Sequence, residues 1–174
     1  MSEIIQPADA SQSALIAALV NKAYRPEACA SGWTHESALV AGDRTSAEQV
    51  AQQMTPSAPV LVAMRNQEII ACVQITHEAP VCWIGMLATL PSAQNAGMGK
   101  KMLMAAEAYA IKHFAPERWM MSVLSSRPEL LRFYQRRGYQ LTGQTSDYPV
   151  KAGVGIPLVN DLRLLELSKA VPAI

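Results

Sequence analysis

The chain has 174 residues, a length at which one domain is typical and a sizeable core forms without disulfides or metals. Charged residues make up 17% of the chain and the formal net charge is +1, so there is no strong field to attract a polyanion. No apolar run reaches the roughly 18 residues that a membrane-spanning helix needs. We therefore expect one domain over residues 1–174, with neither nucleic acid nor membrane as a partner.

The first part of the chain is predicted to contain two helices separated by a long loop. Apolar residues at helical spacing predict the first helix over Leu15–Tyr24, and Pro26 ends it. The stretch Arg25–Arg44 has no clean periodicity and is expected to be an irregular loop. Thr45 and Glu48 have the spacing of a capping box, in which each side chain satisfies a backbone amide of the first turn. The second helix should therefore begin at Thr45.

Three β-rich runs follow, at Pro59–Met64, Ile69–Thr76 and Val81–Leu90. The four polar residues 65–68 between the first two runs predict a hairpin. Alternation in the third run is expected to place one set of apolar side chains on one face (Cys82, Ile84, Met86, Ala88) and another on the opposite face (Trp83, Leu87). Because both faces are apolar, this run should be a central strand covered on both sides.

The second half of the chain alternates between helices and strands. Helices are predicted at Gly97–Phe114 and Pro128–Arg137, the latter ended by Gly138 in a left-handed conformation. Further strands are predicted at Trp119–Leu124, Tyr139–Thr145 and Asp161–Ser168. This order indicates an α+β fold with a mixed, mostly antiparallel sheet flanked by helices and one parallel βαβ step.

A glycine turn joins the third strand to the following helix, with the sequence Gln94-Asn95-Ala96-Gly97-Met98-Gly99-Lys100. Small residues let the backbone approach a ligand, while the unpaired amides and dipole of a helix start favour an anion such as pyrophosphate. The ammonium group of Lys100 or Lys101 could add a positive charge that helps to bind the pyrophosphate. The turn lacks the Ser or Thr of a Walker A loop and the third glycine of a dinucleotide fingerprint. The alternative is that Gly97 and Gly99 only allow a tight turn into the helix and bind no ligand.

The run Leu87-Ala88-Thr89-Leu90-Pro91, followed by Gln94-x-x-Gly97-x-Gly99, resembles the acetyl-CoA-binding motif of the GNAT superfamily of N-acetyltransferases. The resemblance covers about residues 60–144 and implies a GNAT-like sheet whose strands splay apart at the cofactor site. It further implies that backbone groups of Leu87, Ala88 and Thr89 pair with the pantetheine arm of coenzyme A. The turn itself would hold the pyrophosphate through Gln94, Asn95, Ala96, Gly97, Met98, Gly99 and Lys100.

A second segment, Phe133-Tyr134-Gln135-Arg136-Arg137-Gly138-Tyr139, is similar to the F-Y-x-x-x-G-F/Y motif of the same superfamily. Its tyrosine usually lies near the sulfur of coenzyme A, and a phenol can protonate the departing thiolate. Tyr134 is therefore the predicted general acid, with core packing as the alternative, and the Leu87 amide is the predicted oxyanion donor. Arg127 stands where many relatives have asparagine and is expected either at the cofactor or in solvent.

The loop between the first two helices usually helps to wall the acceptor site in this superfamily. Trp33, Glu36 and Asp43 are the predicted acceptor-binding residues, since an indole beside carboxylates suits an amine with an apolar body. The alternative is a surface loop that Trp33 anchors by packing, with no role in binding. Val81–Leu90 carries no carboxylate, so the general base is left to a water chain or to Glu36, Asp43, His77 or Glu78.

Cys29, Cys72 and Cys82 form no CxxC pair, and the three histidines share no ligand spacing, so we expect no disulfide or metal site and a cytoplasmic location. The predicted function is transfer of an acetyl group from acetyl-CoA to a primary amine of a small molecule or a peptide, by direct attack in a ternary complex. A catalytically silent coenzyme A-binding sensor or interaction module is the alternative. The prediction leaves a homodimer open.

Overall fold

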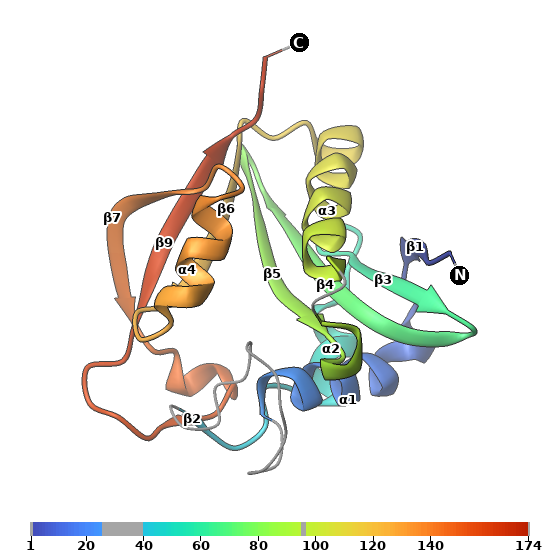
Figure 1. The fold of residues 1–174 in the computed structure, drawn as a ribbon, viewed down its shortest axis with the longest axis horizontal. Coiled ribbons are helices and arrows are strands. Elements are labelled where there is room, and N and C mark those ends of the chain that lie inside the picture. Colours follow the sequence, from blue (N-terminus) through green and yellow to red (C-terminus); the bar gives the residue numbers. More distant parts are fainter. Residues whose placement is uncertain (1, 26–39, 95–96, 174) are drawn as a thin grey trace.

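The computed structural model describes residues 2–25, 40–94 and 97–173, and within them the chain forms a seven-stranded sheet in the order β1-β3-β4-β5-β6-β9-β7 (Figure 1). The helices are α1 (Ser13–Tyr24), α2 (Ala47–Gln53), α3 (Met98–Phe114) and α4 (Pro128–Gln135), with short 3-10 turns at Ala10–Gln12, Pro91–Ala93 and Val150–Ala152. The strands of the large sheet are β1 (Ile4–Pro7), β3 (Val60–Arg65), β4 (Glu68–Glu78), β5 (Val81–Thr89), β6 (Arg118–Leu124), β7 (Gln140–Asp147) and β9 (Arg163–Ala170). A separate small sheet pairs β2 (Val40–Ala41) with β8 (Ile156–Pro157).

Strands β1, β3, β4 and β5 form an antiparallel half of the large sheet. The predicted hairpin is confirmed: Asn66 and Gln67 connect β3 to β4, and both adopt positive φ values (50° and 67°), as a tight two-residue turn requires. Strand β1 has no counterpart in the sequence prediction. It is a four-residue edge strand with mostly exposed side chains, so it lacks the apolar alternation that marks a strand.

Strands β5 and β6 make the parallel step and then separate. They pair at only three positions, from Val81↔Arg118 to Trp83↔Met120, whereas β6 pairs with β9 along its whole length. Figure 1 shows the two strands starting together and diverging towards the end of the molecule that carries α1, with α4 on the β6 side. The predicted mixed sheet, parallel step and splayed strands are therefore confirmed.

Helices cover both faces of the antiparallel half, and each face has its own buried cluster. Helix α3 packs on one face through Met98, Met102, Leu103, Ala106 and Ala110, against β3–β6 and α4. Helix α1 packs on the other face through Ile16, Ala17, Leu19, Val20 and Ala23, together with Val50 of α2. None of the helices in the described part of the chain is long and apolar enough to cross a membrane.

A β-bulge interrupts β5, and it corrects the predicted alternation of side chains. The register with β4 passes from Gln74↔Gly85 to Cys72↔Ala88, so β5 has one extra residue, and Met86 adopts a φ of +53°. Ile84 therefore packs in the α3 cluster, whereas Met86 and Ala88 pack in the α1 cluster. The expectation that all four even-numbered residues share a face is wrong, although β5 is indeed covered on both sides.

Helix α2 begins later than predicted. Its N-cap is Ser46, whose hydroxyl accepts from the Gln49 amide at 3.1 Å, while the Thr45 hydroxyl lies 3.2 Å from the Gln49 side chain. The predicted Thr45–Glu48 capping box is therefore wrong, because the neighbouring serine satisfies the amide instead. The left-handed Gly138 after α4 is confirmed, with a φ of +96°.

Candidate active site

A cavity of about 290 Å³, which we call the turn cavity, opens at the start of α3. It is lined by Tyr24, Leu87, Thr89, Gln94, Gly97, Met98, Gly99, Lys100, Leu130, Phe133, Tyr134 and Arg137. Eight of these are residues that the sequence assigns to the cofactor (Leu87, Thr89, Gln94, Gly97, Met98, Gly99, Lys100, Tyr134). Asn95 and Ala96 lie outside the described residues, and the side chain of Ala88 is buried in the α1 cluster.

The geometry of the glycine turn suits an anion. Gly97 is the N-cap of the 17-residue helix α3, adopts a φ of +76°, and no described side chain caps this helix start. A Cβ placed on Gly97 would meet no described heavy atom within 4 Å, so the space beside the backbone is open. The unpaired amides of the first turn and the positive end of the helix dipole face this region. The Gln94 side chain joins the turn to β5 by donating to the Thr89 carbonyl at 3.1 Å.

Two cations line the turn cavity, and the sequence pointed to only one of them. Lys100 is on the cavity, whereas the ammonium of Lys101 lies 3.4 Å from the Glu3 carboxylate on β1's side of the sheet. Arg137 stacks its guanidinium 3.7 Å from the Phe133 ring centre and donates through Nη1 to the Phe133 carbonyl at 2.8 Å. Its Nε is buried without a hydrogen-bond partner among the described residues, and burial lowers the pKa of the guanidinium. An anion in the cavity would stabilise this cation.

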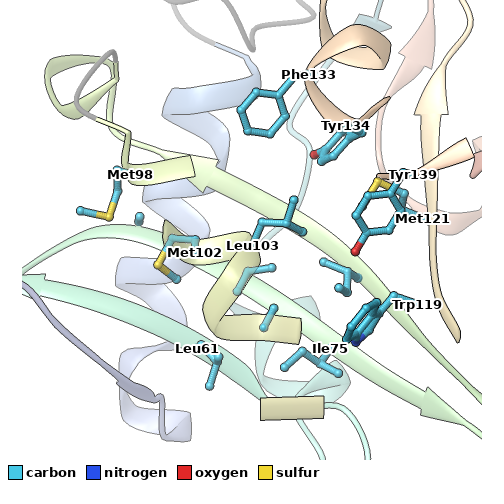
Figure 2. Packing of buried hydrophobic residues seen from close by; sticks show 14 of the residues in the cluster. Leu61, Ile75, Met98, Met102, Leu103, Trp119, Met121, Phe133, Tyr134 and Tyr139 are labelled. Carbon is cyan, nitrogen blue, oxygen red and sulfur yellow. The ribbon is translucent and has the colours of Figure 1, made fainter. Parts of the chain in front are cut away.

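Tyr134 lies where α4 meets the opening between the splayed strands. Its ring packs edge-on against Phe133 (5.2 Å between centres) and Tyr139 (6.2 Å), as Figure 2 shows. Tyr139 is fully inside the core and lines neither cavity, and burial raises the pKa of its phenol. Tyr134 packs and also reaches the cavity, which makes it the accessible phenol of the motif.

A second cavity of about 310 Å³, the strand cavity, lies between the diverging strands β5 and β6. Its lining includes Trp83 and Met86 of β5 and Met121 of β6, together with Arg44, which precedes α2. Four residues line both cavities: Tyr24, Leu87, Leu130 and Tyr134. One molecule in the turn cavity and another in the strand cavity would therefore meet at these four residues.

At this junction, the backbone edge of β5 on the β6 side has no described strand paired with it. Pairing between β5 and β6 ends at Trp83, so β6 does not occupy the backbone edge of Leu87, the predicted oxyanion donor. Tyr24, at the end of α1, donates its hydroxyl to the Leu87 carbonyl at 2.5 Å. This bond ties α1 to the bulged part of β5 and places Tyr24 beside the predicted oxyanion donor.

The residues predicted to bind the acceptor are not brought together by the described structure. Trp33 and Glu36 lie outside the described residues, and Asp43 is exposed and lines neither cavity. Of the other candidates for the general base, His77 stacks on Phe114 (4.7 Å between ring centres) at the far end of β4, and Glu78 is exposed there. No described carboxylate lines either cavity.

Of the two alternatives for Arg127, the structure excludes one. It is 4% exposed, so the solvent-facing alternative is wrong, and its Nε lies 2.6 Å from the Glu129 carboxylate in the first turn of α4. It precedes α4 as its N-cap residue and does not line the turn cavity, so its contact with the cofactor stays a prediction. Within the described ranges, no group of histidine, cysteine or acidic side chains could hold a metal ion.

The segment after β7 forms a wall of the strand cavity, a role that the sequence did not indicate. Tyr148, Pro149 and Val154 line the cavity. Arg25, directly after α1, donates through Nη2 to the Tyr148 hydroxyl at 3.1 Å and to the Val154 carbonyl at 2.9 Å. Pairing of β2 with β8 adds a second attachment. These long-range contacts leave no local pattern in the sequence.

Solved structures with the same fold include three acetyltransferases. The ribosomal-protein-S18-alanine N-acetyltransferase of Escherichia coli has a TM-score of 0.74 at 11% identity, over 99% of this chain and 96% of that one. An N-acetyltransferase from Staphylococcus aureus has a TM-score of 0.72 at 14% identity, over 98% of both chains. A GNAT family acetyltransferase from Elizabethkingia anophelis, solved with acetyl-CoA bound, has a TM-score of 0.67 at 19% identity, over 97% of this chain and 98% of that one.

The comparison with curated proteins gave no match. The model of the acetyltransferase (GNAT) family, however, matches residues 16–139, which include most of α1, the glycine turn and the Phe133–Tyr139 motif. The chain therefore belongs to the GNAT family of acetyl-CoA-dependent acetyltransferases.

Proposed function

We propose that this protein transfers an acetyl group from acetyl-CoA to a primary amine of a small molecule, by direct attack within a ternary complex. The observation that carries the proposal is the pair of cavities that meet at Tyr24, Leu87, Leu130 and Tyr134. Direct attack requires both substrates to be held at once with their reacting atoms in contact. Two cavities that share these four residues provide such an arrangement, whereas a coenzyme A sensor would need only the turn cavity.

The turn cavity has the features that the cofactor requires. The helix start at Gly97–Lys100 offers amides and a dipole for the pyrophosphate, and Lys100 and Arg137 add two positive charges. No described acidic side chain lines this cavity to oppose them. Strand β5 lacks β6 as a neighbour at Leu87–Thr89, and the backbone there is proposed to pair with the pantetheine arm, beside the bonds that the Leu87 and Thr89 carbonyls already accept from Tyr24 and Gln94. This assignment would bring the thioester towards the junction of the cavities.

At the junction, the residues can account for the proton and charge movements of the reaction. A neutral amine attacks the thioester carbonyl, and the amide of Leu87 is the donor proposed for the negative charge that develops on the carbonyl oxygen. The C–S bond then breaks, and Tyr134 gives its phenolic proton to the departing thiolate. Water is proposed to take the proton from the amine and to return a proton to the Tyr134 phenolate, since no described carboxylate lines either cavity.

The test combines thiol release with initial-rate kinetics. The protein is incubated with acetyl-CoA and a panel of small primary amines, and free thiol is measured as each substrate is varied. A ternary complex predicts that double-reciprocal lines intersect. Parallel lines would instead indicate an acetylated enzyme and would contradict direct attack. Binding of acetyl-CoA without amine-dependent thiol release across the panel would favour the silent module.

A further inference from the structure

The charge of the strand cavity is unusual for a site that receives an amine. Among its described lining residues, Arg44 is the one that carries a full charge. The others are apolar or neutral, such as Trp83, Met121, Gln74 and Thr76. A cation in the acceptor cavity repels a polyamine and attracts an acceptor that also carries a negative group.

The backbone that carries Arg44 is held rigidly. The Asn21 side chain of α1 accepts from the Arg44 amide at 2.8 Å and from the Thr45 amide at 3.1 Å, and it donates to the Thr45 carbonyl at 2.9 Å. One side chain therefore fixes the two residues that precede α2 against α1. The result is that Arg44 lines the strand cavity while its neighbour Asp43 is exposed.

The guanidinium of Arg44 is close to the junction of the two cavities. Its central carbon lies 5.9 Å from the ring centre of Tyr24, a residue that lines both cavities. Arg44 itself lines only the strand cavity, so it is not placed to bind the cofactor phosphates. Its side chain is half-buried, and no carboxylate among the described residues forms an ion pair with it.

A half-buried guanidinium without an ion-pair partner is a ready site for a planar anion. Arginine presents paired N–H donors that match the two oxygens of a carboxylate, and these charge-assisted bonds are among the strongest in proteins. A bound carboxylate at Arg44 would leave the amine end of the same molecule near Tyr24, at the junction. Trp83, Met86 and Met121 offer an apolar surface for the remainder of the molecule.

From these observations we infer that the acceptor is an amino acid-like molecule, an amine that carries a carboxylate and an uncharged body, and that Arg44 binds the carboxylate. The inference rests on the proposed function and names its substrate class. It replaces the expected recognition by Asp43, since the described charge on the cavity has the opposite sign. It also places the specificity residue at the end of the loop where the sequence predicted acceptor recognition.

The test compares matched acceptors that differ only in the carboxylate. Methionine with methioninamide, and phenylalanine with phenylalaninamide, are assayed by thiol release at fixed acetyl-CoA. The amides are less basic, so more of their amine is neutral at a given pH, and reactivity alone favours them. We expect kcat/KM to be at least about tenfold higher for the acids in spite of this, as a charge-assisted hydrogen-bonded pair allows.

Variants of Arg44 then test whether this residue causes the preference for acids over amides. Arg44→Gln should raise KM for the acids about 10- to 100-fold, leave the amides little changed, and leave the acetyl-CoA affinity unchanged. Arg44→Lys should restore part of the preference, because it restores the charge but not the paired donors. Arg132→Gln, which removes the same charge from an exposed position on α4 outside both cavities, is the matched control and should behave as wild type.

The outcomes separate the inference from the proposed function. Amides accepted as well as or better than the acids by the wild type would overturn the inference while supporting acetyl transfer to amines. Equal losses for acids and amides in Arg44→Gln, with a lower melting temperature, would show a structural role and also overturn it. If neither member of either pair releases thiol while other amines of the panel do, the inference is overturned and the proposed function stands. If no amine of the panel releases thiol while acetyl-CoA binds, the proposed function fails and the inference fails with it.

Discussion

The most discriminating perturbation of the cofactor site is Gly97→Glu. Gly97 has a φ of +76° and open space where a Cβ would lie, and Gly143 on β7 has nearly the same properties, with a φ of +91° and no described atom within 4 Å of a Cβ. Gly143 lines neither cavity. Gly143→Glu therefore introduces the same side chain with the same kind of backbone strain, at a position away from the proposed pyrophosphate.

Both substitutions should cost similar stability. Placing a non-glycine residue in the left-handed region costs about 1–2 kcal/mol, which lowers the melting temperature by about 2–4 °C per kcal/mol for a chain of this size. Only Gly97→Glu should also repel the cofactor. Two unit charges about 5 Å apart at an effective dielectric constant of about 20 repel by about 3 kcal/mol. The acetyl-CoA affinity of Gly97→Glu should therefore fall by more than about 100-fold.

The assay is a calorimetric titration with acetyl-CoA at low ionic strength, beside thermal melts of the wild type and both variants. We expect similar melting temperatures for Gly97→Glu and Gly143→Glu, and a large loss of affinity in the first alone. If folded Gly97→Glu binds acetyl-CoA as well as Gly143→Glu does, the pyrophosphate does not lie at the start of α3, and the assignment of the turn cavity is refuted.

Three further predictions concern chemistry and reactivity. Tyr134→Phe keeps the ring packed and removes one proton donor, so kcat should fall about 100- to 10,000-fold at unchanged acetyl-CoA affinity; a loss below about threefold would remove Tyr134 from the mechanism. Turnover should rise between about pH 6 and 9, since attack needs a neutral amine, whereas a flat profile with rate-limiting chemistry would reveal a dedicated base. Burial raises the pKa of Cys72 to about 12 and of Cys82 to about 11, so neither thiol should react with an aromatic disulfide at pH about 8 before unfolding. Rapid modification of two or more thiols in the folded protein would contradict their burial.

Features that depend on local sequence were predictable. The hairpin at Asn66–Gln67, the parallel step and the glycine turn each follow from residues that are adjacent in the chain. The β5 bulge was not, because Met86 carries none of the glycine or asparagine signature of a positive φ. Its side chain is turned to the α1 face by one extra residue in the register with β4, which only the folded sheet reveals.

The cofactor half of the site was more predictable than the acceptor half, because more of its residues belong to short local motifs. Gly97–Lys100 and Tyr134 belong to short motifs, whereas Arg137 lies at a variable position of its motif and is brought to the cavity by stacking on Phe133. On the acceptor side, the backbone at Arg44 and Thr45 is held by the Asn21 side chain, more than twenty residues away, and no local pattern indicates that contact.

In the proposed reaction, acetyl-CoA and an amine meet at the junction of the two cavities and the acetyl group passes to nitrogen. The most direct measurement is mass spectrometry of the small-molecule products after incubation with acetyl-CoA and methionine, beside the free thiol released. We expect an N-acetylated product and free coenzyme A in equal amounts, and only a small residual amount of either with Tyr134→Phe. Thiol release without an acetylated amine, or an acetyl group retained on the protein, would contradict it.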